Sequence, residues 1–292
     1  MGGFPSGQRG RTVNPLAQPS QVQILPRPLF LLAIIATNAQ PAPNPLSVMR
    51  RLYIAGLPVD NVSSEEAVAA LESFVLEGSP HMVVTLNPEM VVRASHDAEF
   101  RSIVLSASLV IPDGIGIVLA SRLLGMPLKE RVAGVDTVER FAALAAKKGY
   151  RPFFLGAAPG VAQKAASTLA QRYPGFKVAG FYSGSPSPSE EEAIVKLVRE
   201  SSPDALFVAY GSPAQEKWIA RNLHRLGVPV AMGVGGAFDF IAGIVPRAPK
   251  LIQRAGLEWL FRLLIQPWRW RRQLALPVFC FLVLREKLTA KS

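Results

Sequence analysis

Short apolar segments alternate with helical segments along most of this chain, and this alternation constrains the fold more than any other feature. Strands are expected at 53–59, 81–86, 109–112, 152–155, 177–181, 205–209 and 230–234. Helices are expected to follow Ser63 and Pro88 and to cover 113–124, 161–173, 190–200 and 213–226. Strands that are apolar on both sides are typical of a parallel sheet buried under helices. The sequence therefore predicts an α/β fold with a doubly wound, mostly parallel sheet and helices on both faces.

The composition limits the chemistry. A hydrophobic fraction of 49% over 292 residues is ample for a full-sized core and excludes a wholly disordered protein. The single cysteine, Cys280, cannot form an intramolecular disulfide. One cysteine and three histidines offer too few ligands to favour a His/Cys metal site. We therefore expect neither a metal nor a cofactor.

The net charge of +11 and the isoelectric point near 10.1 indicate a polyanionic partner, such as nucleic acid, an anionic membrane or a phosphorylated substrate. Much of the excess lies between Arg247 and Arg272, where Glu258 is the only acid. Three tryptophans interleave with these basic residues, a mixture typical of a membrane interface rather than of nucleic-acid binding. We expect residues 246–292 to form a basic, amphipathic helical appendage that docks on the cytoplasmic membrane surface.

The apolar run 274–284 in this appendage is too short to span a bilayer. One alternative to membrane docking is an ordinary C-terminal helix packed on the core. A second alternative is an interface between copies of the chain, which an exposed apolar tail could form equally well. The expected location is the cytoplasm, peripheral on the inner face of the plasma membrane.

Residues 1–48 are rich in Pro, Gln, Ser and Asn and contain one short apolar run, 29–36. A disordered extension, or a true start at Met49, fits this composition better than a signal peptide, because the segment before the apolar run is long and broken by prolines. The catalytic domain is expected over 49–245.

Polar side chains stand at predicted strand ends, where α/β sheets bind ligands. Asp113 follows the strand 109–112 directly and could act as a general base on a hydroxyl, or cap the next helix. Thr85 and Asn87 could orient a sugar or phosphate, although Asn before Pro also favours a turn.

Three glycine turns also follow strands. The turn at Gly156 could present backbone amides to a diphosphate, and Gln215 could bind a base or phosphate. Near Gly235, Asp239 could accept ribose hydroxyls. Plain tight turns and exposed polar residues are the alternative interpretation at each place. The turns lack the GxGxxG spacing with a following acid that a nucleotide-dependent oxidoreductase would need.

Taken in order, these segments resemble the WecG/TagA/CpsF family of bacterial glycosyltransferases, over roughly Leu52 to Arg285. The resemblance rests on Thr85-Leu86-Asn87, Pro112-Asp113-Gly114-Ile115-Gly116, Glu130-Arg131-Val132-Ala133-Gly134-Val135-Asp136, Phe154-Leu155-Gly156, Gly211-Ser212-Pro213-Ala214-Gln215-Glu216, Gly233-Val234-Gly235-Gly236-Ala237-Phe238-Asp239 and Gly256-Leu257-Glu258-Trp259-Leu260-Phe261-Arg262. The turn Gly156-Ala157-Ala158 and Ala214 depart from the family's usual residues.

The resemblance implies a single Rossmann-like domain with a C-terminal membrane-docking appendage. It also implies an inverting, metal-independent transfer of ManNAc, ManNAcA or glucose from a UDP-sugar to a polyprenyl-diphosphate-linked saccharide, in cell-surface polysaccharide synthesis. By motif position, Asp113 would be the general base on the acceptor hydroxyl, and Thr85 and Asn87 would orient the acceptor or donor sugar. The UDP moiety would be held by Gly156, Gln215, Gly235 and Asp239. Phosphates of donor or lipid carrier would meet Arg131, Arg262, Arg269 and Arg272. A non-catalytic basic module for membrane or nucleic acid would explain the tail, but it would leave the polar strand ends without a role.

Overall fold

The computed structural model describes residues 49–289, and the interpretation of residues 1–48 lies outside this range. Six parallel strands form the central sheet in the order β4-β3-β8-β7-β5-β6. The strands are β3 (His81–Leu86), β4 (Leu109–Pro112), β5 (Pro152–Gly156), β6 (Gly180–Tyr182), β7 (Ala205–Ala209) and β8 (Val230–Gly233). The predicted α/β class and parallel sheet are confirmed.

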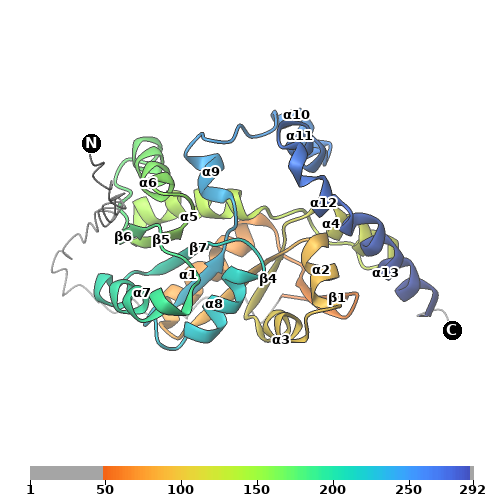
Figure 1. The fold of residues 1–292 in the computed structure, drawn as a ribbon, viewed down its shortest axis with the longest axis horizontal. Coiled ribbons are helices and arrows are strands. Elements are labelled where there is room, and N and C mark those ends of the chain that lie inside the picture. The colour runs from red at the N-terminus through yellow and green to blue at the C-terminus, as the bar shows by residue number, and fades with distance from the viewer. Residues whose placement is uncertain (1–48, 290–292) are drawn as a thin grey trace, which may run out of the picture.

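Helices cover both faces of this sheet (Figure 1). Core residues of one face come from α2 (Pro88–Ala94), α3 (Ala98–Ser106), α4 (Ile115–Leu123), α7 (Pro188–Ser201) and α8 (Ala214–Asn222). The other face is covered by α1 (Ser64–Glu77), α5 (Gly134–Lys148), α6 (Val161–Arg172) and α9 (Ala237–Ile241). The strand residues are buried on both sides, as their apolar sequences require.

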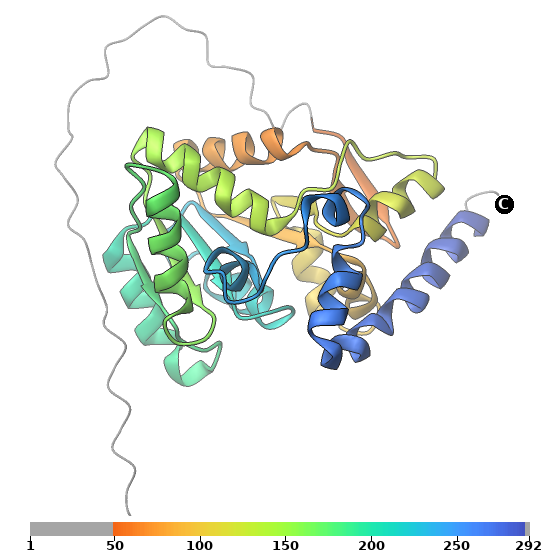
Figure 2. The same cartoon turned by 90° about the horizontal axis from the view of Figure 1, so that it is seen from above.

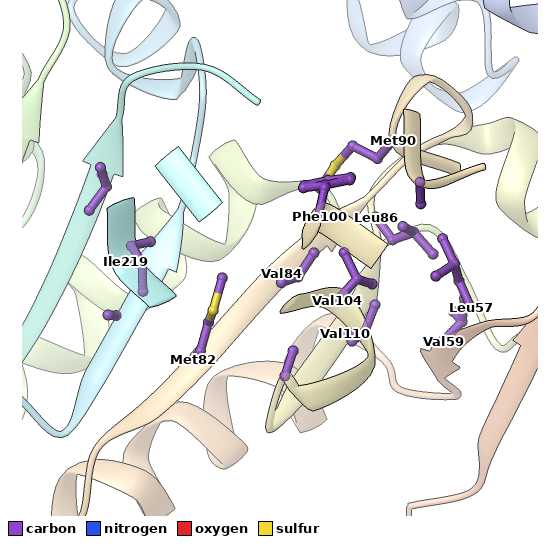
Figure 3. Close-up of a cluster of buried hydrophobic side chains, with 14 of the residues drawn as sticks. Leu57, Val59, Met82, Val84, Leu86, Met90, Phe100, Val104, Val110 and Ile219 are labelled. Carbon is purple, nitrogen blue, oxygen red and sulfur yellow. The ribbon is translucent and has the colours of Figure 1, made fainter. Parts of the chain in front are cut away.

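The apolar side chains of β3 alternate between the two faces of the sheet and contribute to both cores. Met82, Val84 and Leu86 point from β3 toward one face and pack with Phe100 and Val104 of α3 (Figure 3). The intervening residue Val83 belongs to the opposite core cluster, because successive side chains of a strand point to opposite faces. Burial on both faces fixes the register and therefore the position of each strand end.

A hairpin of β1 (Arg51–Ile54) and β2 (Leu57–Asp60) stands where one apolar run, 53–59, was expected to be a single strand. Ala55 and Gly56 form its turn with positive φ angles, which reverse the chain within the run. Asp60 is buried, pairs with Arg51 at 2.7 Å and accepts the backbone N–H of Val110 at 2.7 Å. Asp60 of the hairpin thus provides a hydrogen-bond acceptor for a backbone N–H of the edge strand β4.

Most helix boundaries follow local signals. Ser63 and Glu66 form a capping box at the start of α1, and Asn87 caps α2 with Pro88 in its first turn. Helix α8 ends at Asn222, earlier than the predicted 226, and β6 is shorter than the predicted strand 177–181.

The C-terminal segment is helical and lies against the α/β sheet domain at the side of α2 and α4 (Figures 1 and 2). It comprises α10 (Lys250–Arg254), α11 (Glu258–Ile265), the short 3-10 helix η2 (Pro267–Arg269), α12 (Trp270–Gln273) and α13 (Ala275–Thr289). Phe279 and Val283 bury one side of α13 in the core. Glu286 accepts the N–H of Ala55 at 2.6 Å, which joins α13 to the hairpin. The predicted helical appendage is confirmed.

Candidate active site

The sheet order brings the ends of β4, β3 and β8 side by side. Leu86 is in register with Pro112, so Asn87 and Asp113 are the next residues on neighbouring strands. The helix after β3 packs on one face of the sheet and the helix after β8 packs on the other. In open parallel sheets, ligands bind beyond the strand ends at the point where the connections of two neighbouring strands leave toward opposite faces.

Asp113 stands at the end of β4 with one carboxylate oxygen, Oδ1, accepting the N–H of Gly134 at 3.2 Å. Burial raises the pKa of Asp113 to about 6, although Arg131 and the Gly134 hydrogen bond favour the charged form. A carboxylate with a pKa near the working pH suits general-base chemistry. The helix after Asp113 has no side-chain cap, so the capping role that the sequence left open is not used there.

Thr85 and Asn87 flank the same point. The Thr85 hydroxyl is buried and donates to the carbonyl of Gly233 on β8 at 3.2 Å, which ties two neighbouring strand ends together. The Asn87 side-chain oxygen accepts the N–H of Met90 at 3.1 Å as the cap of α2. Both residues therefore have structural hydrogen bonds, and each retains further hydrogen-bonding capacity toward a ligand.

The side chain of Gln215 is buried from solvent. Its side-chain oxygen accepts the N–H of Gly211 at 3.1 Å and the N–H of Gly235 at 2.9 Å. Its amide nitrogen donates to the Glu216 carboxyl at 2.7 Å. Gln215 thus joins the turns that follow β7 and β8 and sets their positions relative to each other.

Glu216 is fully buried beside Gln215, and burial raises its pKa. One of its oxygens, Oε2, has no hydrogen-bond partner among residues 49–289. A Cβ at Gly233 would lie 2.6 Å from the Gln215 amide nitrogen and 2.9 Å from Glu216, so glycine is needed at that position of β8. The buried pair therefore packs directly beneath the end of β8.

The Gly156 turn lies further along the sheet, where β3, β8 and β7 separate β5 from β4. Gly156 has φ +93°, and a Cβ there would lie 2.8 Å from the ring of Tyr210 and 2.9 Å from the carbonyl of Ala209. The turn is therefore restricted to glycine. Four inter-strand spacings place it about 19 Å from the end of β4.

Arg131 does not stand free near Asp113. Its guanidinium pairs with Glu258 at the start of α11 at 2.8 Å. Glu258 also accepts from Arg247 at 3.1 Å, and Arg247 pairs with Asp136 of α5 at 2.8 Å. This chain of charges connects the appendage to the loop and helix that follow β4.

Arg262, Arg269 and Arg272 form a second group of charges on the appendage. Burial and the positive charges of the other two lower the pKa of Arg269 to about 10, and burial together with Arg272 lowers the pKa of Arg262. Arg272 pairs with Glu89 of α2, whereas no ion pair of Arg262 or Arg269 exists within residues 49–289. Three arginines with one direct acidic partner form a site of excess positive charge.

The electrostatic neighbours of Arg262 include Asp113 and Asp239, which place this group beside the strand ends. A Cβ at Gly236 would come within 2.8 Å of the Arg262 guanidinium, so the glycine leaves room for it. Arg262 also stacks over Phe240 at 4.8 Å. Asp239 lies in the first turn of α9, next to this guanidinium.

Large apolar side chains of the appendage are exposed. Leu264, Trp268 and Trp270 are 71%, 70% and 54% exposed, and Leu274 after α12 is exposed as well. Further exposed apolar residues run along α13, namely Val278, Phe281, Leu284 and Leu288. Within residues 49–289, no helix has the length and apolar character needed to cross a bilayer.

The structure brings together Thr85, Asn87, Asp113 and the appendage arginines, while Gly156 lies several strands away. Sequence reasoning missed the roles of Glu89, Asp136, Glu216, Arg247 and Glu258 in these networks. One signal was present, because Glu258 is the only acid in an otherwise basic stretch. The described residues contain no group of three or more His, Cys, Asp or Glu side chains arranged to hold a metal ion.

Comparison with known proteins shows the family of this chain. The family model for the glycosyl transferase WecG/TagA/CpsF family matches residues 52–292. Three similar proteins, from Bacillus subtilis (strain 168), Bacillus spizizenii and Staphylococcus aureus (strain NCTC 8325 / PS 47), share the name N-acetylglucosaminyldiphosphoundecaprenol N-acetyl-beta-D-mannosaminyltransferase.

The Bacillus subtilis protein is 35% identical over 84% of this chain and 95% of its own length. The Bacillus spizizenii protein is 38% identical over 80% and 91%, and the Staphylococcus aureus protein is 32% identical over 83% and 95%. The matched region includes the sheet, the polar strand ends and the appendage. The chain is a glycosyltransferase and belongs to the WecG/TagA/CpsF family.

Proposed function

We propose that this enzyme transfers an N-acetylhexosamine, with ManNAc as the first candidate, from a UDP-sugar to a polyprenyl-diphosphate-linked saccharide. The names of three similar proteins support ManNAc transfer to GlcNAc-diphosphoundecaprenol. ManNAcA and glucose are the alternative donor sugars. The single observation that carries the proposal is a carboxylate of raised pKa, Asp113, at a strand end beside an arginine-rich appendage.

In the proposed reaction, an acceptor hydroxyl attacks the anomeric carbon while Asp113 takes the hydroxyl proton. The bond from that carbon to the diphosphate oxygen breaks, and UDP leaves with the electron pair. One displacement inverts the anomeric centre. The Asp113 pKa of about 6 leaves the carboxylate ionised at neutral pH and close enough to that pH to act as a base.

We propose that Arg262, Arg269 and Arg272 bind the phosphates of the donor or of the lipid carrier. Arginine guanidinium groups bind phosphate oxygens through paired hydrogen bonds. Three clustered cations lose their mutual repulsion when a diphosphate binds between them, which favours binding. They could stabilise the leaving diphosphate without a metal, and activity that persists in EDTA would support this part of the proposal.

The turns after β5, β7 and β8 are the proposed nucleotide site. The Gly156 turn is the candidate diphosphate site, and Asp239 is the candidate acceptor for ribose hydroxyls. Gln215 supports this site through its bonds to Gly211 and Gly235, so we propose that it positions the turns rather than binding the base.

We propose that the appendage docks on the cytoplasmic face of the membrane. Exposed tryptophans and leucines next to arginines are typical of helices that lie in the bilayer interface. A lipid-linked acceptor would then reach the strand ends without leaving the membrane. Self-association through the same apolar side chains is the competing use of this surface, and vesicle binding and oligomeric state distinguish the two.

The test is UDP release from UDP-ManNAc, UDP-ManNAcA and UDP-glucose, with and without a short-chain prenyl-diphosphate-GlcNAc. We expect release with one donor that depends on the acceptor and is lost in Asp113→Asn, and a product of inverted anomeric configuration by NMR. Lack of turnover with every donor, from a folded and membrane-bound protein, would contradict the proposed donor class.

A further inference from the structure

Glu258 connects the appendage to the surroundings of the proposed base. It is the first residue of α11, and its side chain is 17% exposed. One oxygen, Oε2, pairs with Arg131 at 2.8 Å and the other, Oε1, pairs with Arg247 at 3.1 Å. The carboxylate therefore stands between the guanidinium of Arg131, which follows α4, and that of Arg247, which precedes α10.

The same guanidinium of Arg131 acts on Asp113. The charged groups that face Asp113 are Arg131, from the segment after α4, Asp136 of α5, and Glu258 and Arg262 of α11. The N–H of Gly134 completes the environment at 3.2 Å. Two of the four charged groups belong to the appendage, so the environment of Asp113 depends on whether α11 is seated.

We propose that Glu258 is a positioning residue of the transfer reaction: by sharing Arg131 with Asp113, it makes the base complete only when α11 is seated. This inference rests on the proposed function, because it takes Asp113 to be the base. The appendage would then contribute a residue that adjusts the base, in addition to the arginines that face the phosphates.

The physical reason lies in the charge of Arg131. A guanidinium that faces Asp113 alone stabilises the carboxylate and makes it a weaker base. Glu258 places a second carboxylate on that guanidinium and opposes its effect on Asp113. Departure of α11 would remove Glu258, which lowers the pKa of Asp113, together with Arg262, whose loss raises it. The substitution Glu258→Gln isolates the first of these two effects.

A simpler role must be separated from this one, because Glu258 could merely fasten the appendage. Glu89 offers a matched control. It also forms an ion pair with the appendage, through Arg272 at 2.5 Å, but it is not among the charges that act on Asp113. Glu89→Gln therefore removes one fastening ion pair and leaves the Arg131 neighbourhood intact.

The experiment measures kcat/KM against pH for the full chain and for Glu258→Gln, Glu258→Asp and Glu89→Gln. The acidic limb of the profile reports the base of the free enzyme. We expect Glu258→Gln to move this limb about half a pH unit lower and to reduce the plateau, since the carboxylate ionises more easily and is a weaker base. Glu258→Asp should restore the limb, and Glu89→Gln should reduce the rate without moving it. Equal loss of rate in the two glutamine variants, with the limb unmoved in both, would overturn the proposal.

A second measurement keeps the inference independent of turnover. In a double-mutant cycle of Asp113→Asn and Glu258→Gln, the shifts in the urea midpoint at pH 7 should not add, because each carboxylate acts on the other. Asp113→Asn with Glu89→Gln should be additive. Additive shifts in both cycles would overturn the coupling between Asp113 and Glu258. If the first cycle is non-additive but no donor gives turnover, the coupling is supported and the proposed function is contradicted.

Discussion

Arg272 pairs with Glu89 across 183 residues of sequence, with a distance of 2.7 Å between Nε and Oε2. Glu89 lies in the first turn of the helix that Asn87 caps, so this pair fastens the appendage beside the end of β3. The contact explains how residues near the C-terminus become neighbours of Asp113. It also makes the three appendage arginines part of the candidate active site.

Removing one of these arginines should weaken substrate binding. We expect Arg269→Ala to lower kcat/KM about 10- to 100-fold, because it removes a charge-assisted contact to a phosphate. Separate titrations of donor and lipid acceptor would show which diphosphate it binds. Arg271→Ala is the matched control, since Arg271 is exposed and stacks on Trp270 at 5.7 Å. Equal effects of the two substitutions would contradict a specific phosphate site.

Asp113→Asn should separate activity from stability. Loss of a general base is expected to reduce the rate about 10²- to 10⁴-fold.

The wild-type carboxyl of Asp113 has its pKa raised from 3.8 to about 6, so the folded state binds its proton more tightly than the unfolded state does. Its contribution to stability is therefore present below pH 4 and is lost as the pH rises to about 6. The variant should be more stable than wild type above pH 6, by on the order of 1–3 kcal/mol, with little difference below pH 4. Urea unfolding at several pH values would measure this, and a less stable variant at pH 7 would contradict it.

Membrane binding should depend on the exposed apolar side chains of the appendage. Replacing Leu264 and Trp268 together by serine is expected to reduce partitioning into anionic vesicles about 10²- to 10⁴-fold, since each side chain contributes about 1.5–3 kcal/mol when buried. Leu76→Ser is the control, because Leu76 on α1 is 73% exposed and Leu264 is 71% exposed. Unchanged partitioning together with a changed oligomeric state would assign this surface to self-association.

Glu216 should tolerate loss of its charge but not loss of its oxygen. Burial raises its pKa, so the folded state favours the protonated form, and the contribution of Glu216 to stability falls as the pH rises above its unfolded value. Glu216→Gln keeps an acceptor for Gln215 and should be at least as stable as wild type at pH 7, with the advantage shrinking in acid. Glu216→Ala leaves the amide of Gln215 unpaired and should cost about 1–3 kcal/mol. Thermal unfolding from pH 4 to pH 8 measures both, and a strongly destabilised Glu216→Gln would show that the charge itself is needed.

Much of the fold was predictable because its signals are local. Six runs of apolar residues predicted the six strands of the sheet, and strand β3 runs over His81–Leu86 as expected. Strand ends in a parallel sheet point the same way, so the grouping of Thr85, Asn87 and Asp113 was also predictable. The hairpin was missed because its turn, Ala55-Gly56, interrupts an apolar run that reads as one strand.

The tertiary structure alone decided where the charges go. The sequence determined that the tail is basic, helical and rich in tryptophan, because these are properties of composition and spacing. It could not specify that Glu258 would meet Arg131, 127 residues away, or that Gln215 would turn inward to join two glycine turns. Ion pairs and buried hydrogen bonds depend on the distance between side chains in space, which is fixed only when the strands have taken their order and the appendage has packed against α2.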